Sequence, residues 1–266
     1  GPRHDVQPDF VGSQVAFQVV STLEGGPRSL INEMVEDHSG RIWIATDGGL
    51  SQLDVASGEF SRYRHDPRDP HSLSDDHVIS VYEDSVGSVW VGTFTGGLNR
   101  LDRHHGRFER FAHDADDSRS LSHDYVRAIF EDDRGRLWIG TEDGLNLMDR
   151  RSGDFTRYYR DRSDPQSLSD TYIMSIYQDQ SGLLWFGTRS RGVSRWNSGS
   201  WTMGHYREDW IADAFVTAFA DDSMGTVWIG TLGAGLSRLD LATREVSPFP
   251  LSAELADQRV MSLLRD

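Results

Sequence analysis

The sequence predicts an all-β fold made of repeated four-stranded antiparallel units, and three observations support this. One pattern returns five times along the chain, ending in W-I-A-T, W-V-G-T, W-I-G-T, W-F-G-T and W-I-G-T. The tryptophans of successive copies are 47, 48, 47 and 43 residues apart, and a fixed period in this range indicates a repeat architecture. The apolar runs in each copy are short and rich in β-branched and aromatic residues, which favours strands. Repeated four-stranded sheets that cover one another on both faces are the blades of a β-propeller.

The third copy shows the four strands most clearly. Val126 to Glu131 and Arg136 to Thr141 are predicted strands, separated by the turn E-D-D-R-G. The pair Asp143-Gly144 predicts a second tight hairpin, followed by a strand from Leu145 to Met148. A further turn leads into a fourth strand around Phe155 to Tyr158. Each repeat is therefore expected to be a four-stranded meander.

The tryptophan that marks the second strand of each copy is expected to be structural and to wedge between neighbouring blades. These residues are Trp43, Trp90, Trp138, Trp185 and Trp228.

The two ends of the chain suggest an incomplete ring. Residues 1–14 read as a tail that begins with a protease-cleavage remnant, and residues 15–266 as one partial propeller domain. Val15 to Val20 resembles an outer strand, and Val260 to Asp266 matches the first strand of a repeat. We expect five complete repeats plus part of another blade, as in a fragment of a seven-bladed propeller. The alternative is a six-bladed ring with a two-stranded last blade. Unpaired strand edges predict self-association.

Composition narrows the range of partners. The formal net charge of −15 argues against nucleic acid and anionic membrane surfaces, since both require basic residues. Strong polyanions are also disfavoured as ligands unless one rim concentrates arginine. No apolar run approaches the length needed to insert into a membrane. The chain has no cysteine, which fits an oxidising compartment and the cytosol almost equally.

No pattern of catalytic or metal-binding residues emerges, so we expect no enzyme activity, no cofactor and no metal. The aspartates that recur a few residues before each turn glycine are expected to cap those turns. They are Asp37, Asp84, Asp132, Asp179 and Asp221. The acidic loops such as D-P-R-D-P-H-S-L-S-D-D lack the alternating oxygen ligands and closing glutamate of a calcium loop.

A comparison of the repeats with one another predicts where a ligand would bind. The start of the first strand and the hairpin between the second and third strands lie at the same end of each blade. At this rim the residues differ between copies, whereas the turns at the opposite end are nearly identical. The rim positions are also aromatic or basic, although unselected surface variation accounts equally well for any one of them. The predicted ligand-binding residues are His77, Phe94, Tyr125, Tyr172, Arg189, Arg191, Phe215 and Trp210.

The connector between the fourth and fifth copies is irregular. Trp196 aligns with Leu53, and Trp201 is expected to take the place of Phe60 in the outer strand. Trp210 has no aromatic counterpart and is either a stacking platform for a sugar ring or a cap on a shortened loop.

The pattern E-D-x-x-G-x-[LV]-W-[IV]-G-T-x-x-G-[GL]-L, preceded by S-L-S-D-D-H-V or S-L-S-H-D-Y-V, resembles the two-component regulator propeller repeat. The resemblance runs from Val15 to Asp266. In that family such repeats form periplasmic sensor domains of membrane-bound histidine kinases or diguanylate cyclases. The resemblance therefore implies a periplasmic, ligand-sensing or signal-transmitting input domain.

Two functions follow as hypotheses. The first is a sensor domain that binds a small neutral ligand, such as an oligosaccharide, at the variable rim. The second is a structural propeller that dimerises or docks a partner protein and takes no small ligand. An aromatic pocket at the rim favours the first, and a broad apolar edge or outer face favours the second.

Overall fold

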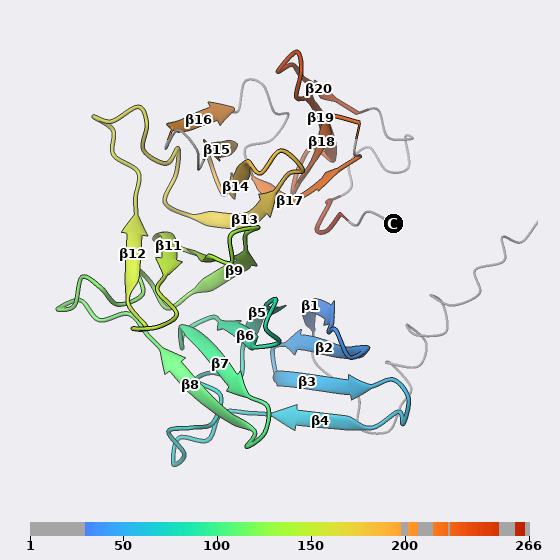
Figure 1. The fold of residues 1–266 in the computed structure, drawn as a ribbon, viewed down its shortest axis with the longest axis vertical. Helices are drawn as coiled ribbons and strands as arrows, with labels where there is room; N and C mark the ends of the chain where they lie inside the picture. The colour runs from blue at the N-terminus through green and yellow to red at the C-terminus, as the bar shows by residue number, and fades with distance from the viewer. Residues whose placement is uncertain (1–29, 198–201, 207–214, 223, 250–258, 264–266) are drawn as a thin grey trace, which may run out of the picture.

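The computed structural model describes residues 30–197, 202–206, 215–222, 224–249 and 259–263, and the regular structure within these ranges is all β. Its strands form five antiparallel sheets of four strands each, and strands that are consecutive in sequence are neighbours in the sheet. Each sheet is one propeller blade, and the five blades follow one another in an arc (Figure 1). The predicted β-propeller of four-stranded blades is confirmed.

The strand bounds are as follows. Blade 1 contains β1 (Ile31–Glu36), β2 (Arg41–Thr46), β3 (Gly49–Asp54) and β4 (Phe60–Tyr63); blade 2 contains β5 (Val78–Glu83), β6 (Val89–Thr93), β7 (Leu98–Asp102) and β8 (Arg107–Phe111). Blade 3 contains β9 (Val126–Glu131), β10 (Leu137–Thr141), β11 (Gly144–Met148) and β12 (Phe155–Tyr158). Blade 4 contains β13 (Ile173–Gln178), β14 (Leu184–Thr188), β15 (Val193–Asn197) and β16 (Thr202–Tyr206); blade 5 contains β17 (Val216–Asp221), β18 (Thr226–Thr231), β19 (Leu236–Asp240) and β20 (Val246–Pro248).

The first strand of each blade is the inner one. Strands β1, β5, β9, β13 and β17 contact one another in succession, while the fourth strands lie at the periphery (Figure 1). In the part of the chain described, no helix has the length and hydropathy required to cross a bilayer.

The first four marker tryptophans lie between blades, as predicted. Trp90 packs in one apolar cluster with Ile129 and Leu137 of blade 3, and Trp138 packs with Phe186 and Trp196 of blade 4. The first four marker tryptophans are at most 1% exposed. Trp228 is half-buried and meets Phe249 edge to face, with ring centroids 4.9 Å apart.

The recurring aspartates cap the turns between the first and second strands. Asp37 Oδ1 accepts hydrogen bonds from the amides of Ser39 and Arg41, and its Oδ2 accepts one from the Trp43 indole at 3.0 Å. Burial opposes ionisation of Asp37, but these hydrogen bonds outweigh it and lower the pKa of its carboxyl to about 2. One side chain thus fixes both the turn and the tryptophan behind it.

Two residue assignments from the sequence are wrong by one or two positions. In blade 5 the turn is capped by Asp222, whose Oδ1 accepts from the amides of Met224 and Thr226, and not by Asp221. In blade 4 the residue paired with Trp196 is Met203, so Met203 and not Trp201 takes the place of Phe60. Trp201 itself lies outside the described residues. Both residues keep the regular spacing from the marker tryptophan: Asp222 lies six residues before Trp228, as Asp37 lies before Trp43, and Met203 lies 18 residues after Trp185, as Phe108 lies after Trp90.

The glycine of the W-[IV]-G-T segment marks a close approach between blades. A Cβ placed on Gly140 would lie 2.7 Å from Ile173 Cγ2, the first residue of the next inner strand. The equivalent glycines face Val126, Val216 and Val260 in the same way. A side chain at this position would therefore force neighbouring blades apart.

We expect Gly140→Ala to lower the free energy of unfolding by about 1–3 kcal/mol, the usual cost of overpacking a tight interface. Gly204→Ala is the matched control, because a Cβ there would meet only Arg195 atoms at 3.7 Å or more. Urea denaturation of both variants measures the difference. Equal stability of the two variants would contradict the assigned interblade contact.

Most residues of the strands predicted at the two ends of the chain lie outside the described ranges. Residues 15–20 are not described, and residues 259–263 carry no assigned strand. Val260 nevertheless lies close to Gly230, as Val126 lies close to Gly92. Its amide donates a hydrogen bond to Thr231 O at 3.0 Å. Val260 therefore occupies the position of a first residue of an inner strand.

Candidate functional site

Five of the predicted ligand-binding residues form one continuous row of ring contacts across blades 2, 3 and 4. His77 stacks on Phe94 with ring centroids 4.9 Å apart, and Phe94 meets Tyr125 edge to face at 4.8 Å. Tyr125 in turn meets Tyr172 at 6.0 Å, and the Arg189 guanidinium lies 5.0 Å from the Tyr172 ring centroid. The structure thus brings together residues that are far apart in sequence.

The repeat itself positions this row. The residue before each inner strand accepts a hydrogen bond on its carbonyl from the first residue of the blade's central hairpin. Phe94 donates to His77 O at 2.9 Å, and Arg189 donates to Tyr172 O at 3.1 Å. Glu142 donates in the same way to Tyr125 O. Both sets of variable positions therefore lie at one end of each blade, as the meander predicts.

Acidic side chains hold the row at both ends. His77 Nε2 lies 3.0 Å from Asp47 Oδ1 of blade 1. Burial opposes ionisation of Asp75, yet hydrogen bonds from the His77 amide and from Thr95 lower the pKa of this carboxyl. Asp170 accepts from Ser190 in the equivalent position of blade 4, at 2.7 Å from the hydroxyl. These contacts fix the backbone of the hairpins and of the residues before the inner strands, which carry the aromatic rings.

Tyr172 is the most perturbed titratable group of the row. Burial raises the pKa of its phenol, and its interaction with Tyr125 raises it further. The phenol is therefore neutral at physiological pH and remains a hydrogen-bond donor. Phe94 is 43% exposed, so the row offers aromatic surface to solvent. Aromatic faces beside a guanidinium and a neutral hydroxyl suit stacking on a ring with polar substituents.

The remaining predicted site residues lie elsewhere. Arg191 belongs to the same hairpin as Arg189 but lines a separate cavity. Phe215 takes the position of Tyr172 in blade 5, where its carbonyl accepts from the Leu232 amide at 3.1 Å. Trp210 lies outside the described residues.

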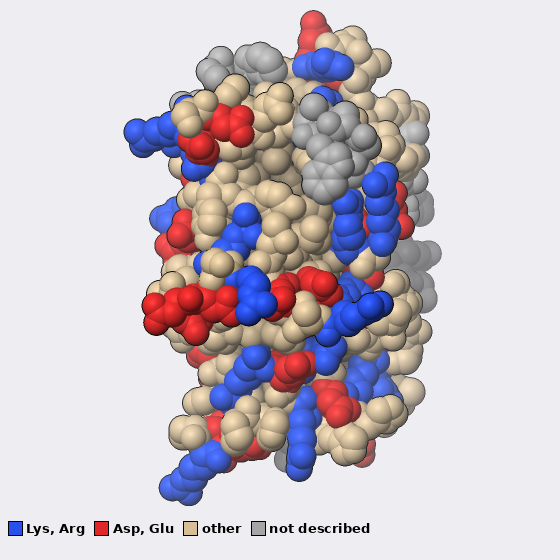
Figure 2. Space-filling model, turned by 60° about the vertical axis from the view of Figure 1, so that its left-hand side comes forward, with Lys and Arg blue, Asp and Glu red and all other residues tan. Residues whose placement is uncertain are grey.

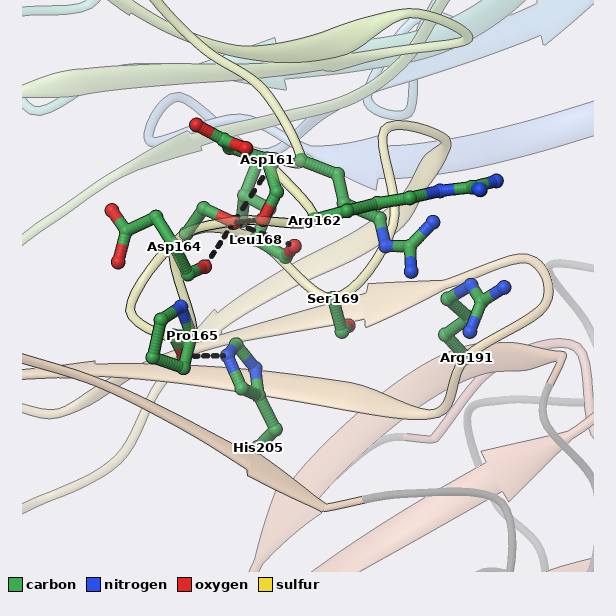
Figure 3. Close-up of a pocket in the computed structure, with 10 residues that line it drawn as sticks. Asp161, Arg162, Asp164, Pro165, Leu168, Ser169, Arg191 and His205 are labelled. Atoms are coloured by element: carbon green, nitrogen blue, oxygen red, sulfur yellow. Dashed lines mark hydrogen bonds between the residues drawn. The ribbon is translucent and has the colours of Figure 1, made fainter.

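The cavity beside Arg191 is a feature that the sequence comparison missed. It has a volume of about 500 Å³ and lies between the loop that precedes blade 4 and strands of that blade (Figure 3). Arg160, Arg162 and His205 contribute to its lining. A comparison of the fourth strands could have indicated this place, because His205 stands where blades 2 and 3 both have an arginine.

The acidic interblade loops are organised by their own aspartates. Asp66 and Asp69 accept hydrogen bonds from the amides of Arg68 and His71, each at 2.9 Å, and the two later loops repeat this arrangement. Within the described ranges, no group of three or more His, Asp or Glu residues could hold a metal ion.

Charged side chains of both signs are interspersed on the side of the molecule shown in Figure 2. The net charge of −15 is therefore not spread as a uniform negative surface, and local groups of arginine persist.

A sequence profile described as "Two component regulator propeller" matches four segments of the chain, residues 25–48, 72–95, 120–143 and 167–190. Each of these segments contains one turn-capping aspartate and its marker tryptophan. A search of curated protein sequences found no match.

Solved structures share the propeller fold. The extracellular domain of BT3049 from B. thetaiotaomicron, assigned to a hybrid two-component system, is 23% identical with a TM-score of 0.73, over 84% of this chain and 30% of that one. The extracellular domain of BT4673 from the same organism, assigned to a one-component system, is 21% identical with a TM-score of 0.72, over 92% and 33% of the two chains. Virginiamycin B lyase from Staphylococcus aureus is 18% identical with a TM-score of 0.62, over 85% and 72%. The chain spans about a third of the length of the two extracellular domains.

Proposed function

The chain is built from two-component regulator propeller repeats, and from that premise we propose that it is a ligand-sensing input domain of a transmembrane signalling protein. The domain works outside the cytoplasm, in the periplasm. The similar folds of BT3049 and BT4673, both extracellular domains assigned to signalling systems, support this proposal.

The observation that carries the proposal is the row His77–Phe94–Tyr125–Tyr172–Arg189. A purely structural rim has no need of four contacting rings that run across three blades, with Phe94 exposed to solvent and the other three half-buried. Contacts between the rings limit their motion, so little conformational entropy is lost when a ligand stacks on them. The ligand class that fits is a small neutral solute with ring faces and hydroxyl groups, such as an oligosaccharide.

The role we assign is binding and not catalysis. The row contains aromatic rings, an arginine and a histidine paired with Asp47, but no pair of carboxylates or nucleophile with its base. The likeness to a lyase concerns the propeller scaffold, on which unrelated functions occur.

A thermal-shift screen with neutral oligosaccharides tests the proposal, since a ligand that binds only the folded state raises the melting temperature. We expect the double variant Tyr125→Ala/Tyr172→Ala to keep its fold and to lose roughly 2 kcal/mol of binding free energy, about the value of a buried aromatic contact at a binding hot spot. The affinity is measured by isothermal titration calorimetry with the sugar that gives the largest shift.

Tyr159→Ala is the matched control, because Tyr159 is 41% exposed and lies outside the row. Unchanged sugar affinity in the double variant would remove these tyrosines from the site. A change in oligomeric state instead of affinity, seen by light scattering, would favour the docking or dimerisation propeller.

A further inference from the structure

The cavity next to blade 4 lies where blades 2 and 3 carry an arginine that bonds to the preceding loop. Arg110 on β8 donates from Nε to Ser72 O at 2.9 Å and from Nη2 to Asp69 O at 3.0 Å. Arg157 on β12 repeats these bonds to Ser120 O and Asp117 O at 2.7 and 2.8 Å. In both blades the guanidinium thus occupies the interior of the loop that precedes the blade.

In blade 4 the position of this arginine is held by His205. The pairing of Ser194 with His205 corresponds to the pairing of Asn146 with Arg157. His205 Nε2 lies 3.1 Å from Pro165 O, and its Nδ1 lies 3.2 Å from Ser194 Oγ. Both members of this pair are smaller than their counterparts in blade 3. Both replacements remove side-chain volume beside the cavity of about 500 Å³.

The cavity carries three arginines whose guanidinium groups have no hydrogen-bond or ion-pair partner within the described part of the chain: Arg160, Arg162 and Arg191. Arg160 stands where His65 and His113 bond to loop carbonyls in the two earlier loops. In Figure 3 the side chains of Arg162 and Arg191 extend to the same side of the cavity, with Ser169 near them.

The two aspartates of the cavity are occupied by the loop itself. Asp161 Oδ1 accepts from the amide and the hydroxyl of Ser163, at 2.8 and 2.7 Å. Asp164 Oδ1 accepts from the Gln166 amide at 2.8 Å. Both carboxylates are therefore hydrogen-bonded within the loop, while the arginines remain available to a ligand.

We propose that this cavity is a binding site for a hydroxylated organic acid, whose carboxylate or sulfate group is held by the arginines. A guanidinium presents parallel N–H donors that match an oxyanion, which a neutral solute does not exploit. The volume exceeds what a bare ion needs and suits a body of sugar size. The Ser169 hydroxyl, which also lies 2.8 Å from Ser194 Oγ, supplies a polar contact to that body. This site is distinct from the aromatic row and does not depend on it.

The test is isothermal titration calorimetry at low and high salt with four probes: D-glucuronate, a sulfated glucose, D-glucose and inorganic sulfate. We expect saturable binding of D-glucuronate or the sulfated glucose, weakened at high salt, and at least tenfold weaker binding of D-glucose and sulfate. The first two probes distinguish a carboxylate from a sulfate ester. Equal binding of D-glucose would overturn the role of the arginines, and equal binding of sulfate would overturn the organic body.

The double variant Ser194→Asn/His205→Arg restores the pair found in blade 3 and places a guanidinium in the interior of the loop, beside the cavity. We expect it to melt at or above the temperature of the parent and to lose acid binding at least tenfold. Arg191→Ala should weaken binding to a similar degree, whereas Arg151→Ala, in a turn of blade 3 outside the cavity lining, should leave it unchanged. Undiminished binding of the acid by Ser194→Asn/His205→Arg, or no saturable binding of either acid by the parent, would overturn the proposal. A failure of the aromatic-row variants does not bear on this result.

Discussion

Replacing Trp138 by alanine is expected to lower the free energy of unfolding by roughly 3–5 kcal/mol, the usual cost of deleting a large buried aromatic side chain. Trp138 is 1% exposed and meets Trp196 of blade 4 edge to face at 5.0 Å. Its indole N–H donates to Asp132 Oδ2 at 2.8 Å. The change therefore opens a cavity between two blades and leaves a buried carboxylate oxygen with one donor fewer.

Chemical denaturation measures this loss, and Val86→Ala is its control because Val86 is 77% exposed in a turn. The control should stay within about 0.5 kcal/mol of the parent. Trp138→Phe should fall between the two, since it retains an aromatic ring but no indole donor. A Trp138→Ala variant as stable as the control would refute the wedge role of the marker tryptophans.

Asp84→Ala is expected to destabilise the protein by about 3–5 kcal/mol, as is usual when one partner of a buried ion pair is removed. Asp84 is 1% exposed, and its Oδ1 accepts from the Ser88 amide at 2.7 Å. Its Oδ2 accepts from Trp90 Nε1 at 2.8 Å and from Arg150 Nη1 at 3.2 Å. Arg150 comes from the next blade, so one carboxylate joins a turn, a tryptophan and the blade interface.

Urea denaturation is again the measurement, with Asp102→Ala as the control. Asp102 caps a turn through the His104 amide at 3.0 Å, but its side chain is 48% exposed, and a clearly smaller loss is expected. The loss of stability in Asp84→Asn should lie between these two values. The amide keeps one oxygen acceptor, but its NH₂ group faces the donors of Trp90 or Arg150 and cannot accept from them. Equal losses for Asp84→Ala and Asp102→Ala would show that the interblade contacts add no stability.

Local sequence was sufficient for the blades because their determinants lie within a few residues of one another. The predicted strands Val126 to Glu131 and Phe155 to Tyr158 coincide with β9 and β12, and β10 and β11 each differ from prediction by one residue at one end. Aspartate, turn glycine and tryptophan recur at a fixed spacing because one carboxylate bonds both the turn amides and the indole. The assignments of Asp221 and Trp201 departed from this spacing, which places Asp222 six residues before Trp228 and Met203 18 residues after Trp185.

The sequence by itself determined the fold class, the order of the strands and the rim at which the variable residues gather, since turn chemistry and strand period act over short distances. Only the tertiary structure decided that His77, Phe94, Tyr125 and Tyr172 touch, because their contacts depend on how closely successive blades approach. It alone also revealed the cavity at His205, whose volume depends on the space between a loop and the strand packed against it. The side chain at this position is shorter than its counterparts in blades 2 and 3, but only the packing of the loop against the strand shows that a cavity lies beside it.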